Sequence, residues 1–217
     1  NKFNIPVVLN SPHVGKNFQD HLGLDYLYKT YFPTLNKDLG TWGGRVRSFL
    51  QYVYNRKGPL SLSLNQGGGY VNWKSLDPYP NIQLYFNPLT YSVSFKNKRP
   101  LLNTDKFNGF IIGFNSCRPK SLGEVNLQNI DNNYLPSIDP RYLSDERDIH
   151  DLYSTFDFIR KFSLNKNISN IIKSPVNIDP IKLSDDELLN HFKSNATTIY
   201  HPCGCLLYTS DAADELR

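Results

Sequence analysis

The feature that most constrains this chain is a change of hydrophobic period near residue 128. Residues 80–127 contain three segments rich in β-branched and aromatic residues: NIQLYFNPL, FNGFIIGFNSC and GEVNLQN. Pro, Gly and Asn separate these segments, as is typical of strands. Because no helical pattern stands between them, we expect neighbouring strands to run antiparallel.

Helical spacing replaces the strand pattern further along the chain. In LSDERDIHDLYSTFDFIRKFSL, Ser144 is the expected N-cap, and one apolar stripe follows: Ile149, Leu152, Phe156, Ile159 and Phe162. A second helix is predicted at LSDDELLNHF, where Ser184 and Glu187 have the spacing of a capping box. The pattern predicts an α+β fold, with an antiparallel sheet flanked by helices and packed against the stripe.

Two predictions concern residues that precede this sheet. The segment GGRVRSFLQYVYNRKGPL has apolar residues at helical spacing and a Gly-Pro stop, so it is predicted to be a helix of about three turns. The segment SLSLNQGGGYVNW follows and is predicted to be a loop, because its three consecutive glycines permit unusual dihedral angles. It lacks the Gly-Lys-Ser/Thr of a phosphate-binding loop.

Composition excludes several classes of protein. Hydrophobic residues make up 39% and aromatic residues 13% of the 217, which is enough to fill a core and argues against disorder. The net charge of +4 is spread thinly, with no basic stripe interleaved with aromatics, so no nucleic-acid partner is expected. No apolar run approaches the roughly 20 residues of a membrane span. The sequons at Asn167 and Asn195 fit a secreted protein, but the compartment stays open.

The histidines and cysteines give no compelling site by themselves. His201, Cys203 and Cys205 form His-x-Cys-x-Cys, but a fourth zinc ligand at a usual spacing is missing, so no metal site is expected. His21 follows Asp20, and a carboxylate can orient an imidazole base, although adjacent residues of a strand point to opposite faces. The remaining helical histidines, His150 and His191, are expected to face solvent.

Three longer motifs carry a resemblance to a known family. The segment VLNSPHVGKNFQDHL resembles the Pro-Gly-Val-Gly-x-Asn-Leu-Gln-Asp-His of glucose-methanol-choline (GMC) oxidoreductases. The segment CRPKSLGEVNLQNIDNNYLPSIDPRYLSDERD is similar to that family's Arg-Pro-x-Ser-x-Gly-x-Val-x-Leu, Asp-Pro-x-Tyr-Leu and following helix. The segment SDDELLNHFKSNATTIYHPCG resembles the approach to its His-Pro-x-Gly-Thr-Cys-x-Met-Gly. The three occur in the family's order and span nearly all of residues 5–204.

The chain departs from the family pattern at two places. His13 stands where the first motif usually has Gly, and CLLYTSDAADE stands where the last motif should continue. Reverse translation of those letters matches a widely used transposase sequencing adapter. We therefore expect native sequence to end at Gly204, and residues 205–217 to be an artefactual tail that fold reasoning should exclude.

The resemblance implies a division of the chain and a cofactor. Residues 1–22 would be a piece of the FAD-binding domain, residues 23–196 the substrate-binding domain, and residues 197–204 a return toward the FAD-binding domain. The Rossmann glycine fingerprint of the family does not occur in these 217 residues, and its catalytic base is expected beyond Gly204. The chain would then be an internal fragment, inactive alone, of an FAD enzyme that oxidises an alcohol by hydride transfer to flavin.

The resemblance also nominates site residues. Gln83, Tyr85 and Asn87 alternate along one predicted strand and would line the substrate pocket, although Tyr85 reads equally well as a core aromatic. Asn115 and Cys117 are weaker pocket candidates. The expected flavin-side residues are Gly15, Asn17, Asp20 and His201, with His201 in a supporting role. A small alcohol is the expected partner, and its identity, the electron acceptor and the oligomeric state are not specified.

Two other functions are alternatives to that of an enzyme. A truncated GMC-like module without catalysis, acting in binding or structure, would have the same sequence up to Gly204. A carbohydrate-binding β module would present exposed aromatics on a flat sheet, and the amphipathic helices argue against it.

Overall fold

The computed structural model describes residues 3–8, 10–94, 101–131 and 133–205. Its centre is an antiparallel sheet in the order β10-β2-β7-β4-β3, with β11 also paired to β2. The strands are β2 (Leu22–Thr30), β3 (Gly67–Val71), β4 (Ile82–Asn87), β7 (Gly109–Ser116), β10 (Ile172–Pro175) and β11 (Thr197–Thr198). The central strands therefore come from distant parts of the sequence.

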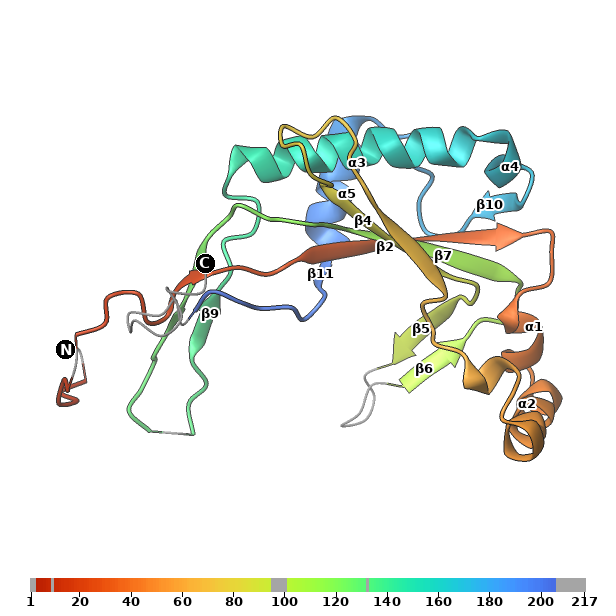
Figure 1. The fold of residues 1–217 in the computed structure, drawn as a ribbon, viewed down its shortest axis with the longest axis horizontal. Coiled ribbons are helices and arrows are strands. Elements are labelled where there is room, and N and C mark those ends of the chain that lie inside the picture. The colour runs from red at the N-terminus through yellow and green to blue at the C-terminus, as the bar shows by residue number, and fades with distance from the viewer. Residues whose placement is uncertain (1–2, 9, 95–100, 132, 206–217) are drawn as a thin grey trace.

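Helices cover one face of this sheet. Figure 1 shows α3 (Glu146–Leu164) lying along the sheet, with α5 (Asp185–Asn195) crossing it. Alternate residues of the central strands point toward the helices, and the core they form includes Tyr26, Ile82, Ile112, Phe114, Phe156 and Phe192. Each such side chain contributes about 1.5–3 kcal/mol when fully buried. The opposite face of the sheet is not covered by these two helices.

Smaller elements lie at the two ends of the sheet. A three-stranded sheet in the order β1-β8-β9 combines Lys16–Phe18, Gly123–Asn126 and Ser137–Asp139. At the other end are α1 (Leu35–Leu39), α2 (Trp42–Asn55) and the hairpin of β5 (Tyr91–Ser94) and β6 (Leu101–Thr104). A 3-10 turn, η1 (Pro59–Ser61), follows α2, and α4 (Lys166–Ser169) follows α3.

Most of the predicted elements are confirmed. The antiparallel pairing of β4 with β7, the three helices and the Ser184–Glu187 capping box are all present. The predicted stripe packs on the sheet through Leu152, Phe156 and Ile159, which are buried. The N-cap of α3 is Asp145 rather than Ser144, because the Asp145 carboxylate accepts from the Arg147 backbone N–H at 2.9 Å.

Three predictions about the strands were wrong or incomplete. The predicted loop at residues 61–73 contains β3, in which a Cβ on Gly68 would lie 2.3 Å from the Leu84 carbonyl oxygen, so glycine permits the close pairing. The strand at 123–126 joins β1 and β9 instead of extending the main sheet. The central strand β2 was not predicted, although it pairs with β7 over its length.

Candidate functional site

The face of the sheet opposite the helices carries several polar side chains. On β4, Gln83, Tyr85 and Asn87 point to this face because Ile82 and Leu84 belong to the core on the other side. The same alternation places Asn115 of β7 and Asp25 of β2 on this polar face, where Gln83 is in register with Asn115. We call this surface the open face.

One row across the open face joins Tyr85, Gly113 and Asp25 on three neighbouring strands. The Tyr85 hydroxyl donates to Asp25 Oδ1 at 2.8 Å, across Gly113. A Cβ on Gly113 would lie 1.9 Å from the Tyr85 ring and 2.5 Å from Asp25 Oδ1, so glycine is needed for the ring to lie flat over the sheet. A hollow of about 320 Å³ beside this row is lined by residues that include Asp25, Tyr85, Asn177 and Ile199.

The pKa values of both titratable side chains in this row are shifted. Burial raises the pKa of the Asp25 carboxyl, and the hydrogen bond from Tyr85 only partly offsets this effect. Burial also raises the pKa of the Tyr85 phenol, and the nearby charge of Asp25 raises it further. Tyr85 is therefore a neutral hydrogen-bond donor, and Asp25 is a carboxylate whose charge is costly where it lies.

The next row contains Gln83, Asn115 and His21. Asn115 is fully buried, and its amide donates to Gln83 Oε1 at 3.2 Å and to the Ser116 carbonyl at 3.0 Å. His21 Nδ1 lies 2.5 Å from the same Ser116 carbonyl. The Asn115 amide nitrogen also lies 3.3 Å from His21 Nδ1, so the His21 ring is tied to both Asn115 and the end of β7.

His201 stands against His21 at the edge of the open face. Their rings are T-shaped, with centroids 5.9 Å apart and planes at 85°. The side chain of His201 is exposed, whereas its backbone N–H donates to Asp20 Oδ1 at 3.0 Å. Two imidazoles are therefore presented together next to the polar rows.

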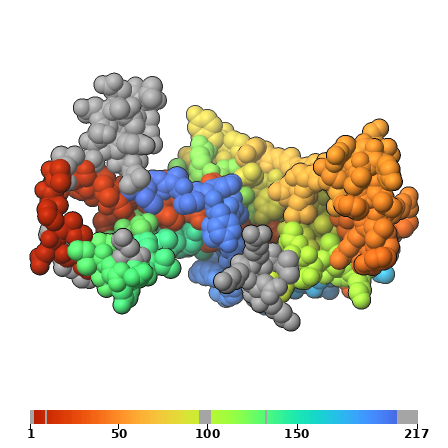
Figure 2. All heavy atoms as spheres, turned by 90° about the horizontal axis from the view of Figure 1, so that it is seen from below, coloured from red at the N-terminus to blue at the C-terminus, as the bar shows by residue number. Residues whose placement is uncertain are grey.

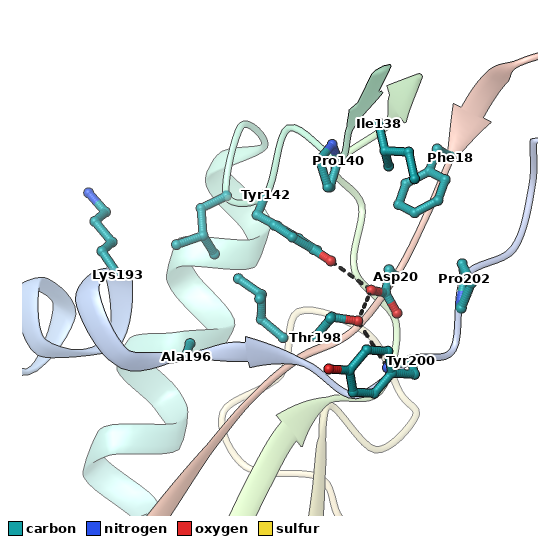
Figure 3. A pocket seen from close by; sticks show the side chains of 12 residues that line it. Phe18, Asp20, Ile138, Pro140, Tyr142, Lys193, Ala196, Thr198, Tyr200 and Pro202 are labelled. Atoms are coloured by element: carbon teal, nitrogen blue, oxygen red, sulfur yellow. Dashed lines mark hydrogen bonds between the residues drawn. The ribbon is translucent and has the colours of Figure 1, made fainter. Parts of the chain in front are cut away.

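Asp20 lies beneath this pair and is 6% exposed. Its carboxylate accepts from the backbone N–H of His21 at 2.9 Å, from the Tyr142 hydroxyl at 2.6 Å and from the Thr198 hydroxyl. Figure 3 shows Tyr142 and Thr198 converging on Asp20 at the wall of a hollow of about 780 Å³. Burial raises the pKa of Asp20, but its hydrogen bonds outweigh that effect and hold the pKa below its usual value.

The structure places the predicted pocket residues in two groups. Gln83, Tyr85 and Asn115 meet on the open face, together with Asp25 and His21. Asn87 is buried at the far end of β4, where its amide nitrogen donates to the Leu64 carbonyl at 3.0 Å. Cys117 lies outside the rows, and a smaller hollow of about 350 Å³ is lined by both Cys117 and Cys203. Burial raises the pKa of the Cys117 thiol.

The predicted flavin-side residues are also divided. Gly15 has φ +76°, and its N–H and C=O are both paired within the chain, to the Cys205 carbonyl at 2.8 Å and the Val125 N–H at 2.7 Å. Asn17 has φ +57° and lies in β1. Asp20 uses its carboxylate inside the chain, as described above. His201 is the member of the set that presents its side chain to the outside.

Sequence reasoning missed Asp25, and it gave no role on this face to His21. The alternation of Leu24, Tyr26 and Tyr28 in LGLDYLYKT was the signal for Asp25, since it marks the residues between them as facing the other side of a strand. In the described part of the chain, no group of three or more His, Cys, Asp or Glu side chains is arranged to hold a metal ion. No helix among the described residues is long and apolar enough to cross a membrane.

Comparisons with known proteins agree with one another. Residues 119–214 match the family model described as GMC oxidoreductase. The chain is 28% identical over 213 residues to an oxygen-dependent choline dehydrogenase of Burkholderia ambifaria, covering 98% of this chain and 37% of that protein. It is 29% identical over 210 residues to an alcohol dehydrogenase [acceptor] of Pseudomonas putida, covering 96% of this chain and 37% of that protein.

Solved structures show the same fold. A formate oxidase from Aspergillus oryzae has a TM-score of 0.77 at 20% identity, with 94% of this chain and 39% of that one covered. A pyridoxine 4-oxidase has a TM-score of 0.66 at 19% identity, with 94% and 35% covered. These likenesses show that the chain has the fold of one part of each of these proteins.

The family-model match and the two curated relatives support membership of the GMC oxidoreductase family. The antiparallel sheet of the chain, with helices on one face, corresponds to the substrate-binding domain in that family's C-terminal region. The chain spans 37% of the length of the curated relatives described above. The family match runs past Gly204 to residue 214, so the adapter origin of residues 205–217 stays a prediction.

Proposed function

We propose that this chain is the substrate-binding part of an FAD-dependent enzyme that oxidises a small alcohol. The observation that carries the proposal is the open face, where Tyr85, Asp25, Asn115 and Gln83 form hydrogen-bonded polar rows beside two imidazoles. Ligand sites are formed in this way, by a few convergent polar groups with perturbed acidities on a rigid scaffold. The names of the curated relatives support an alcohol as the substrate.

The division of the chain supports the same proposal. Thr197 and Thr198 of β11 pair with Gly23 and Leu22 at the start of β2, so residues 197–204 return to the segment that precedes the sheet. Gln19 and Cys203 form a further antiparallel bridge there. Figure 2 shows this blue C-terminal segment lying against the red N-terminal one. We propose that residues 1–22 and 197–204 form the side of this chain that meets the FAD-binding domain.

The described residues fit a flavin on the open face better than at Gly15 or Asp20. Both of those residues use their hydrogen-bonding groups internally, whereas His201 is exposed and Gln83 and Tyr85 are on the open face. When bound, FAD would accept a hydride from the alcohol carbon. A site of this kind has to hold the alcohol in one orientation for that transfer.

Different residues of the open face would contribute to holding the alcohol. Tyr85 is neutral at pH 7 and is held by Asp25, so it presents a fixed phenol edge to the pocket. Asn115 fixes Gln83 in the neighbouring row. His21 contacts the Ser116 carbonyl through Nδ1, and the His201 ring stands beside it. The base that takes the hydroxyl proton remains predicted beyond Gly204.

The proposal is tested by comparing this chain with the complete parent protein. We expect the parent to purify with bound flavin that choline or a simple primary alcohol bleaches under anaerobic conditions. The 217-residue chain should neither retain FAD nor oxidise an alcohol, because it lacks the glycine turn and helix N-terminus that bind the pyrophosphate. A parent without flavin would contradict the enzyme and favour the non-catalytic module.

A second measurement tests the assigned role of His201. In the parent, His201→Asn should lower turnover and leave the acidic limb of the kcat/KM pH profile in place, since His201 is expected to support the flavin site. Loss of that limb would make His201 the base and would contradict the placement of the base beyond Gly204.

A further inference from the structure

The Asp20 carboxylate joins three segments of the chain that are remote in sequence. Oδ1 accepts from the backbone N–H groups of His21 and His201, at 2.9 and 3.0 Å. Oδ2 accepts from Tyr142 at 2.6 Å and from the Thr198 hydroxyl. These donors come from His21 just before β2, from the loop before α3, and from residues 197–204. A carboxylate has about four acceptor positions, so all of them are used within the chain.

The return segment, residues 197–204, is otherwise held by its backbone. Ile199 N–H donates to the His21 carbonyl at 3.1 Å, and Cys203 exchanges hydrogen bonds with Gln19 at 2.8 and 2.9 Å. Between these two attachments the chain turns at Tyr200, which has φ +61° and an exposed side chain. The bond from His201 N–H to Asp20 fixes the backbone immediately after this turn.

We infer that Asp20 is a positioning residue: its carboxylate clamps the return segment to the start of β2 and thereby sets the His201 ring against His21. The catalytic meaning of this inference rests on the proposed function, whereas the clamp itself does not. It also gives Asp20 a different role from the cofactor contact that the resemblance implies, because no acceptor position is left for a ligand.

The clamp requires an ionised Asp20. Its folded-state pKa is depressed, so its stabilising contribution is present above the pKa of the unfolded chain and is lost as pH falls through the folded-state pKa. The carboxylate is therefore charged at neutral pH, and its four hydrogen bonds are charge-assisted.

Hydrogen exchange of the 217-residue chain tests the clamp without any assay of activity. Asn at position 20 keeps one acceptor oxygen and gains a donor, so Asp20→Asn cannot accept from all four groups. We expect exchange in residues 197–204 to speed up about tenfold or more, with protection of β2 and β7 retained. Asp145→Asn is the matched control, because Asp145 also accepts from a backbone N–H and a side chain, at the start of α3.

The control should leave residues 197–204 protected. Unchanged protection of that segment in Asp20→Asn would overturn the inference. An equal loss of protection throughout β2 and β7 would also overturn it, because Asp20 would then serve global stability alone.

Turnover of the complete parent protein tests the consequence for the imidazole pair. Asp20→Asn should lower kcat about tenfold and leave KM within about twofold, because Tyr85 and Gln83 are fixed by the sheet and not by Asp20. Tyr142→Phe and Thr198→Val each remove one donor and should give smaller losses of kcat. An unchanged kcat together with a released return segment would overturn the positioning role. A parent that oxidises no alcohol would contradict the proposed function and leave the exchange result standing.

Discussion

Gly113 shows how a single residue determines the geometry of the open face. Its missing side chain lets the Tyr85 ring cross β7 to reach Asp25. Gly113→Ala should destabilise the chain by about 1–3 kcal/mol in urea unfolding, as overpacking does. Gly69→Ala, in the same sheet, is the control, since a Cβ there meets nothing within 4 Å. Equal effects of the two substitutions would show that the tight contact at Gly113 is relieved without cost.

The charge of the Asp25 carboxylate is predicted to lower the stability of the folded chain at neutral pH. Its raised pKa means that the folded chain binds this proton more tightly than the unfolded chain does. The associated stability is full below the unfolded pKa and falls as pH rises toward the folded-state value. Asp25→Asn can still accept from Tyr85, so it should raise Tm at pH 7 and leave it nearly unchanged near pH 3. A lower Tm at pH 7 would contradict this account.

Individual residues of the site could be predicted only where the alternation of side chains within one strand indicated their face. The alternation of Gln83 and Tyr85 in NIQLYFNPL predicted that they share a face, and that face is polar. The Tyr85–Asp25 bond joins residues that are 60 positions apart, and its formation depends on the register of β4, β7 and β2. No local pattern specifies that register, so Asp25 was missed.

At the scale of elements, apolar spacing predicted helices well but did not predict what they bury. The stripes of α2 and α3 have similar spacing, yet Leu152 of α3 is 5% exposed and Leu50 of α2 is 47% exposed. The sheet buries the stripe of α3, whereas the neighbours of α2, α1 and η1, leave its stripe largely exposed. Strand β3 was missed for a related reason, because its glycines are strand-like only when paired with β4.

This contrast predicts different costs for one substitution in two helices. Leu152→Ala should lower the free energy of unfolding by about 2–5 kcal/mol, because it opens a cavity between α3 and the sheet. Leu50→Ala should change it by no more than about 0.5 kcal/mol, as is usual at exposed positions. Urea unfolding of the 217-residue chain measures both. A large loss for Leu50→Ala would mean that α2 is packed more tightly than its exposure indicates.

At the scale of the whole molecule, α3 and α5 cover one face of the main sheet, and two smaller sheets lie toward its ends (Figure 1). The α+β class and the antiparallel pairing followed from the sequence, since strand texture and helical spacing occupy separate stretches. The position of β8 in a second sheet did not follow from the sequence, because tertiary contacts determine which strands pair.

The most direct test of the open face as the substrate wall compares two tyrosines of β2 and β4 in the complete parent protein. Tyr85 and Tyr28 each make one side-chain hydrogen bond, to Asp25 at 2.8 Å and to Ser163 at 3.2 Å, but Tyr28 faces the core under the helices. Tyr85→Phe should lower kcat/KM for the alcohol about tenfold, and Tyr28→Phe should leave it within about twofold. Equal losses, or no loss for Tyr85→Phe, would contradict the assignment of the open face as the pocket wall.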